Sequence, residues 1–151
     1  MTTVSQKIAY IQARWHADIV DRALVGFEER MAEAGFDMPI ETYNLAGAFE
    51  LPLAAKRLAA RDDIACVVAA GFVVDGGIYR HEFVADAVVS GLMQVQLEMD
   101  TPVFSVVLTP HNFQETEEHI NFFKAHFVIK GREAADAVMG TLAVHRKLVA
   151  A

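Results

Sequence analysis

The stretch IACVVAAGFVV, residues 64–74, decides the fold of this chain because it carries no charged or polar side chain. A strand with one face in solvent alternates apolar and polar residues, whereas a strand covered on both faces reads as a continuous apolar run. Strands of the second kind occur almost only in parallel sheets with helices packed on both sides. The rest of the chain is therefore expected to supply neighbouring parallel strands and the helices that cover them.

Three other segments are predicted to be strands of the same sheet: residues 7–13, 39–46 and 101–109. KIAYIQA and TPVFSVVLT are short, apolar and partly β-branched, and PIETYNLA alternates as a half-buried strand does. Apolar residues at helical spacing predict helices between and after the strands. The expected helices cover residues 17–34, from Pro52 to about 61, 81–99, 114–124 and 131–149.

The elements follow one another in the order β-α-β-α-β-α-β-α-α, and no linker or low-complexity segment interrupts them. Residues 1–151 are therefore expected to form one domain. The predicted fold class is α/β: a three-layer, flavodoxin-like sandwich in which helices flank a four-stranded parallel sheet. Right-handed crossovers follow from the chirality of the chain.

The helix expected at 81–99 is apolar around most of its circumference. Its two apolar stripes are Val84, Val88, Leu92, Val95 and Met99, and Ala85, Val89, Met93 and Leu97. A helix apolar on most sides is covered on most sides. With 54% apolar residues in the whole chain, this pattern indicates packing on the sheet and on a second subunit, so we expect a homo-oligomer.

Composition excludes several classes of function. The net charge is −7 and the cations form no block, which argues against nucleic acid as a partner. No apolar run approaches the roughly 20 residues of a membrane span. Cys66 is the only cysteine and no HExxH motif is present, so neither a disulfide nor a zinc site is expected. The first residues lack the apolar region of a signal peptide, and a cytoplasmic protein is expected.

Ligands of parallel α/β sheets bind beyond the carboxyl ends of the strands. This rule selects four loops: QARWH (12–16), NLAGAFE (44–50), VVDGGIYRH (73–81) and LTPHNF (108–113). Each carries polar or aromatic side chains that a ligand can use.

Arg80 and His81 form the most informative pair in these loops. A cation at the start of a helix opposes the helix dipole, so two basic groups together need a reason. Salt bridges to nearby carboxylates provide one, and a bound anion with proton transfer by the histidine provides another. Both remain open on the residues alone.

The other candidates have equally plain structural explanations. Trp15 is either a core or interface residue or a platform for a flat ligand. Glu50 suits a helix start through the macrodipole alone. Gly76 and Gly77 suit any tight turn as well as an anion-binding nest, and Lys130 is either solvated or a phosphate ligand at a helix start.

The loops jointly resemble one family, the lumazine synthases of riboflavin biosynthesis. The motifs that carry the resemblance are Trp15 after the first strand, AGAFELP (46–52), the GG-x-x-x-H turn, PVFSVVLT (102–109) and KGREAA (130–135). It covers nearly the whole chain. It implies condensation of 5-amino-6-(D-ribitylamino)uracil with 3,4-dihydroxy-2-butanone 4-phosphate to 6,7-dimethyl-8-ribityllumazine, phosphate and water, without cofactor or metal.

The resemblance also implies roles for individual residues. It implies that Trp15 stacks on the pyrimidine and that the ribityl chain is contacted by Ala48, Phe49 and Glu50. The pyrimidine edge would meet backbone groups of Phe72, Val73 and Val74. The phosphate pocket would be lined by Gly77 and Ile78 with Lys130 nearby, and the neighbouring subunit would supply Ser105 and His119. The active site is therefore expected at a subunit interface.

The chain departs from the common family pattern at three positions. Ile78 stands where a phosphate-binding threonine is usual, Arg80 where the proton-shuttling histidine is usual, and His119 where a phosphate-binding arginine is usual. This pattern resembles the divergent second type of the family, a dimer of pentamers, whereas other members form single pentamers or sixty-subunit shells. Because guanidinium stays protonated, we expect Arg80 mainly to bind phosphate and His81 or a neighbouring group to move protons.

Two other functions occur on α/β folds of this kind. The missing threonine and the displaced histidine leave room for a non-catalytic flavin- or lumazine-binding carrier on the same fold. A flavodoxin-like signalling receiver needs clustered acidic residues after the first strand to hold Mg²⁺, and residues 12–14 are Gln, Ala and Arg, which excludes it.

Overall fold

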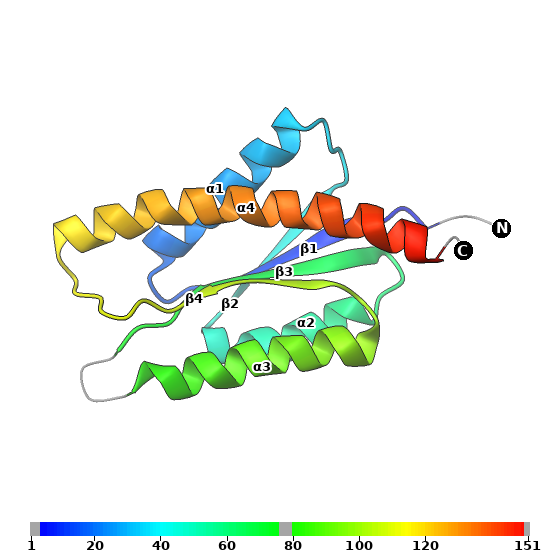
Figure 1. Cartoon of the computed structure of the whole chain (residues 1–151). Helices are drawn as coiled ribbons and strands as arrows, with labels where there is room; N and C mark the ends of the chain where they lie inside the picture. The colour runs from blue at the N-terminus through cyan, green and yellow to red at the C-terminus, as the bar shows by residue number, and fades with distance from the viewer. Residues whose placement is uncertain (1–3, 76–79, 150–151) are drawn as a thin grey trace.

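The computed structural model describes residues 4–75 and 80–149, which form a four-stranded parallel sheet between two helical layers (Figure 1). The strands are β1 (Lys7–Ala13), β2 (Ile40–Leu45), β3 (Ile64–Phe72) and β4 (Val103–Leu108). The helices are α1 (Ala17–Glu33), α2 (Leu51–Ala59), α3 (His81–Met99) and α4 (Glu117–Val149), with a 3₁₀ turn at Ala48–Glu50 before α2. The predicted fold class is confirmed.

The strand order is β2-β1-β3-β4, so the apolar stretch that begins at Ile64 lies inside the sheet, between β1 and β4. Helices α1 and α4 cover one face and α2 and α3 cover the other (Figure 1). Tyr10 and Phe127 belong to the first core, whereas Ile11 and Leu51 belong to the second. The side chains of consecutive β1 residues therefore pack into the cores on opposite faces of the sheet, as the alternation of a strand requires.

The prediction of two helices at the end of the chain is wrong, because α4 runs unbroken from Glu117 to Val149. Gly131 lies in its interior and is buried against α1. A Cβ at Gly131 would lie 1.8 Å from the carbonyl oxygen of Ala23, and one at Gly26 would lie 2.0 Å from that of Val128. Gly131 therefore allows the two helices to cross closely, and it does not mark the end of a helix.

Helix α4 has 33 residues, which is ample length for a bilayer. Its apolar residues, however, are interrupted by charged ones, of which Lys124, Arg132 and Asp136 pair with side chains of α1. Among the residues described, no helix combines the length and the apolar character needed to cross a membrane.

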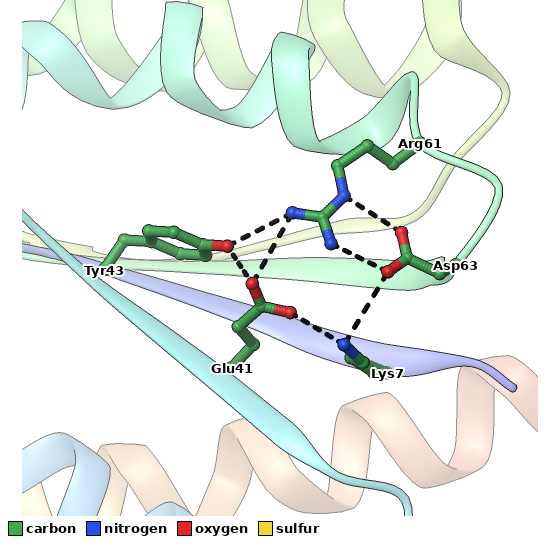
Figure 2. A network of polar contacts seen from close by, with 5 residues as sticks. All are labelled: Lys7, Glu41, Tyr43, Arg61 and Asp63. Atoms are coloured by element: carbon green, nitrogen blue, oxygen red, sulfur yellow. Dashed lines mark hydrogen bonds and ion pairs between the residues drawn. The ribbon is translucent and has the colours of Figure 1, made fainter.

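A network of charged side chains closes the amino-terminal edge of the sheet (Figure 2). Arg61 donates to both carboxylate oxygens of Asp63, at 2.9 Å from Nε and 2.7 Å from Nη2, and to the Tyr43 hydroxyl at 3.1 Å. Lys7 Nζ lies 3.3 Å from Glu41, which also accepts a hydrogen bond from Tyr43. The network links β1, β2 and the turn before β3, at the edge opposite the predicted ligand loops.

Candidate active site

A cavity of about 680 Å³ opens at the carboxyl ends of β1, β2 and β3, where the strand-end rule predicts a ligand site. Residues from the loop after β4 complete it. The lining residues are Ala13, Trp15, His16, Gly47, Ala48, Phe49, Glu50, Phe72, Val73, Val74, Asp75, Arg80, His81, Val84, Phe113 and Glu115.

Two large aromatic side chains at this cavity lie mostly in solvent. Trp15 is 71% exposed and Phe49 is 68% exposed, although burial of such rings is strongly favourable. Gly47 lies beside the indole: a Cβ there would approach Trp15 Cδ1 and Nε1 to 3.4 Å and Glu50 Oε2 to 3.1 Å. The absence of a side chain at Gly47 therefore leaves room for Trp15 and Glu50 at the cavity.

The inner wall of the cavity is aromatic. The Phe72 and Phe113 rings meet edge to face at 5.0 Å, and the His16 ring lies 5.8 Å from Phe72 and 5.3 Å from Phe113. His16 stands before α1 in the left-handed conformation, with φ 55°, a region that non-glycine residues rarely occupy. This backbone geometry turns the chain from β1 into α1 directly at the cavity.

The start of α3 brings a cluster of charged groups to the cavity. His81 Nδ1 lies 2.6 Å from Asp75 Oδ1, and the His81 backbone N–H donates to the same oxygen at 3.1 Å. The His81 side chain is only 14% exposed. These hydrogen bonds hold the pKa of Asp75 below its usual value, so Asp75 is a carboxylate at neutral pH.

Arg80 turns toward its own helix. Its Nε and Nη2 lie 2.8 and 2.6 Å from Glu82 Oε1, and its guanidinium lies 4.8 Å from the centre of the Phe83 ring. The pKa of Glu82 is lowered by backbone hydrogen bonding and by Arg80. Of the two explanations open from sequence, the salt bridge is therefore present, and the guanidinium still lines the cavity.

One group of described residues can offer three ligand atoms to a metal ion. Asp75, His81 and Glu82 have such atoms within 4.8 Å of one another. His81 already pairs with Asp75 at 2.6 Å and lies 3.5 Å from Glu82, so hydrogen bonding and ion pairing account for this geometry. Elsewhere, burial raises the pKa of the Cys66 thiol to about 12, which makes it a poor thiolate ligand.

The cavity gathers most of the residues predicted for the site. Those that line it are Trp15, Ala48, Phe49, Glu50, Phe72, Val73, Val74, Arg80 and His81. Gly77 and Ile78 lie outside the described residues.

Three predicted residues lie away from the cavity lining. Ser105 is exposed on β4, where its Oγ accepts from the Val107 N–H at 3.2 Å. His119 Nδ1 accepts from the Gln114 N–H at 3.0 Å, and its ring lies 6.2 Å from that of Phe113. Lys130 does not start a helix, contrary to expectation; it lies inside α4 and pairs with Glu133 at 3.0 Å.

Sequence reasoning missed Asp75, Phe113 and Glu115 as site residues. All three lie in or just beyond loops that the strand-end rule selects, and Asp75 is the first charged residue after the apolar stretch of β3. That position of Asp75, at the end of a buried strand, was the signal in the sequence that could have identified it. The pairing with His81, six residues later, depends on how the chain turns between them.

Comparison with known proteins identifies the relatives of this chain. The model of the family described as 6,7-dimethyl-8-ribityllumazine synthase matches residues 5–146. A Rhodococcus erythropolis protein named 6,7-dimethyl-8-ribityllumazine synthase is 56% identical over 138 residues, which are 91% of this chain and 89% of the relative. Two proteins named 6,7-dimethyl-8-ribityllumazine synthase 2 are also similar. That of Pseudomonas syringae pv. tomato is 54% identical over 95% of this chain and 85% of its own length, and that of Bradyrhizobium diazoefficiens is 51% identical over 91% and 82%.

Proposed function

Because this chain belongs to the 6,7-dimethyl-8-ribityllumazine synthase family, we propose that the cavity at the carboxyl edge of its sheet is the active site. The protein is a transferase of riboflavin biosynthesis. It condenses 5-amino-6-(D-ribitylamino)uracil with 3,4-dihydroxy-2-butanone 4-phosphate to 6,7-dimethyl-8-ribityllumazine, phosphate and water. The observation that carries the proposal is that one cavity is lined by residues from three separate strand ends for which substrate contacts are proposed.

Trp15 and Phe49 are proposed to hold the flat pyrimidine and the start of the ribityl chain. Their exposure in the isolated chain supports this role, because a stacked ring would cover apolar surface that otherwise faces water. Glu50 offers carboxylate oxygens to the ribityl hydroxyls. The backbone from Phe72 to Val74 offers peptide groups to the pyrimidine edge.

Arg80 and His81 are proposed to serve the phosphate substrate. The Arg80 guanidinium can bind a phosphate with two parallel hydrogen bonds, whereas the His81 imidazole has ring nitrogens that can donate or accept a proton. Gly77, Ile78 and Lys130 remain proposed phosphate contacts. The substrates supply the reacting amine and carbonyl, so this chemistry proceeds by orientation and proton transfer without a cofactor.

The active enzyme is proposed to be a homo-oligomer with this site at a subunit interface. Val89, Met93 and Leu97 of α3 support it, because they form an apolar stripe that is 44%, 54% and 74% exposed. A neighbouring copy would bring Ser105 and His119 to the cavity. The resemblance to the second type of the family is the reason to propose a decamer built from two pentamers. The single cysteine, buried Cys66, suits a reducing cytoplasm.

Trp15 provides a direct test of the proposed site, since it is the only tryptophan of the chain. Titration with 5-amino-6-(D-ribitylamino)uracil is expected to quench and shift its emission in step with binding measured by equilibrium dialysis. The Trp15→Phe variant is the control for signals from elsewhere. Saturable binding that leaves the Trp15 emission unchanged would place the pyrimidine outside this cavity.

A further inference from the structure

Asp75 makes two contacts with His81, and only one of them caps the helix. Asp75 follows β3 directly, and one of its oxygens meets both the backbone N–H and the ring Nδ1 of His81, at 3.1 and 2.6 Å. The N-cap residue of α3, Arg80, makes no capping hydrogen bond of its own. The first contact is what a helix start needs, but the second is not required for capping.

The second contact determines where the imidazole carries its proton. A carboxylate can only accept hydrogen bonds, so a ring nitrogen 2.6 Å from it must be the donor. His81 therefore carries a proton on Nδ1, and its Nε2 is left as the atom that can take a proton from a ligand. When Nε2 is protonated, the resulting imidazolium lies beside a negative charge that stabilises it.

We infer that Asp75 is a positioning residue, which fixes the tautomer and orientation of His81 so that Nε2 exchanges protons with the substrate. The inference rests on the proposed role of His81 in proton transfer. In the step, the substrate's C–H or N–H bond breaks, its electron pair stays on the substrate, and the proton binds to Nε2. Nδ1 keeps its proton throughout, and Asp75 keeps its negative charge.

Several other charged or titratable groups face His81 or share its cavity. Glu82 lies 3.5 Å from Nδ1 on the same helix, and Arg80 neutralises it from the preceding residue. His16, Glu50 and Glu115 reach the cavity from the loops before α1, α2 and α4. Asp75 differs from all of these because it approaches the ring nitrogen within hydrogen-bond distance.

The Asp75→Asn variant tests the inference, because asparagine keeps an oxygen for the His81 N–H but loses the charge. We expect kcat to fall roughly tenfold to a hundredfold, part of the 10²–10⁴ that general acid–base catalysis supplies, with little change in KM. We also expect the acidic limb of the pH–rate profile to move to lower pH, because the imidazolium loses its neighbouring carboxylate. Asp75→Glu should recover part of kcat. Asp86→Asn, an exposed carboxylate of α3 outside the cavity lining, should behave as the wild type.

A double-mutant cycle with His81→Ala separates the possible outcomes. If Asp75 acts through His81, adding Asp75→Asn to His81→Ala should change kcat less than twofold. An undiminished loss in that background would overturn the inference, and so would activity that requires an added divalent metal held by Asp75. If His81→Ala lowers turnover while Asp75→Asn leaves kcat and the pH profile unchanged, the inference fails and the proposed role of His81 stands. If His81→Ala itself has no effect, the proposed role fails.

A spectroscopic measurement on the unmodified protein covers the case in which Asp75→Asn folds poorly. The ¹⁵N shifts of the His81 ring, assigned by comparison with His81→Ala, should report Nδ1 protonated and Nε2 unprotonated at high pH. The opposite tautomer would overturn the inference without any variant at Asp75.

Discussion

Arg61 is the central residue of the charge network at the amino-terminal edge of the sheet (Figure 2). Its hydrogen bonds to Asp63 hold the pKa of that carboxyl below its usual value, and the Tyr43 hydroxyl with Lys7 and Arg61 does the same for Glu41. A carboxyl group with a lowered pKa in the folded state stabilises that state when it is ionised. The stabilisation is complete above the pKa of the unfolded chain and is lost as the pH falls through the lower folded value.

We therefore expect the thermal midpoint to be nearly constant above about pH 5 and to fall steadily below about pH 4.5. Arg61→Gln should lower the thermal midpoint at neutral pH. It should also make the fall of the midpoint between about pH 4.5 and pH 3 less steep. Calorimetry across this range measures both effects. Arg57→Gln removes an exposed arginine of α2 that is outside the network and should leave the slope unchanged. Equal slopes for wild type and Arg61→Gln would show that the network does not control acid stability.

At the scale of elements, the close crossing of α1 and α4 depends on two glycines. Gly26 of α1 lies against the backbone of α4, and Gly131 of α4 lies against the backbone of α1. Because a Cβ at Gly131 would meet the Ala23 carbonyl at 1.8 Å, the helices would have to move apart to admit it. We expect Gly131→Ala to lower the free energy of unfolding by about 1–3 kcal/mol, the usual cost of overpacking. Chemical denaturation of the purified protein measures it.

Gly140 provides the control in the same helix. A Cβ there has no atom within 4 Å, so Gly140→Ala should raise stability by about 0.5–1 kcal/mol through helix propensity alone. If both alanine variants were stabilising, the close crossing would not exist in solution.

This crossing also explains where sequence reasoning about the elements failed. The strands and α3 were predictable because continuous or periodic apolar patterns respond to burial on the faces of a sheet. The break expected near Gly131 was wrong, since a glycine in a helical pattern looks the same whether it ends a helix or admits another backbone. Only the position of α1, distant in sequence, distinguishes the two cases.

At the scale of the whole molecule, α3 has one stripe buried in the core and another exposed. Val89 on the exposed stripe is 44% exposed, and Val25 on α1 is 42% exposed, which gives a matched pair. We expect Val89→Lys to weaken assembly and lower activity together, because a charge at an apolar interface is costly. Val25→Lys should leave both unchanged.

Sedimentation velocity at micromolar concentration, combined with the activity of each fraction, tests the pair. A folded wild-type monomer with full activity would contradict the proposed interface site. Equal assembly of Val89→Lys and wild type would show that this stripe of α3 is not the contact.

The position of the cavity was predictable from the sequence, because parallel strands place their carboxyl ends at one edge. Its internal arrangement was not. The contacts of Arg80 with Glu82 and of Asp75 with His81 depend on side-chain directions at a helix start that no periodic pattern encodes. The residues alone left Trp15 open between a core residue and a ligand platform, and its 71% exposure at the cavity is what the structure adds.

Steady-state formation of 6,7-dimethyl-8-ribityllumazine by the wild type, Arg80→Ala and His81→Ala, followed by fluorescence across pH, tests the central claim most directly. We expect Arg80→Ala mainly to raise KM for the phosphate substrate, because it removes a binding cation. We expect His81→Ala mainly to lower kcat, by roughly 10²-fold or more, and to abolish the acidic limb of the profile. Unchanged turnover and an unchanged pH profile in His81→Ala would contradict the account.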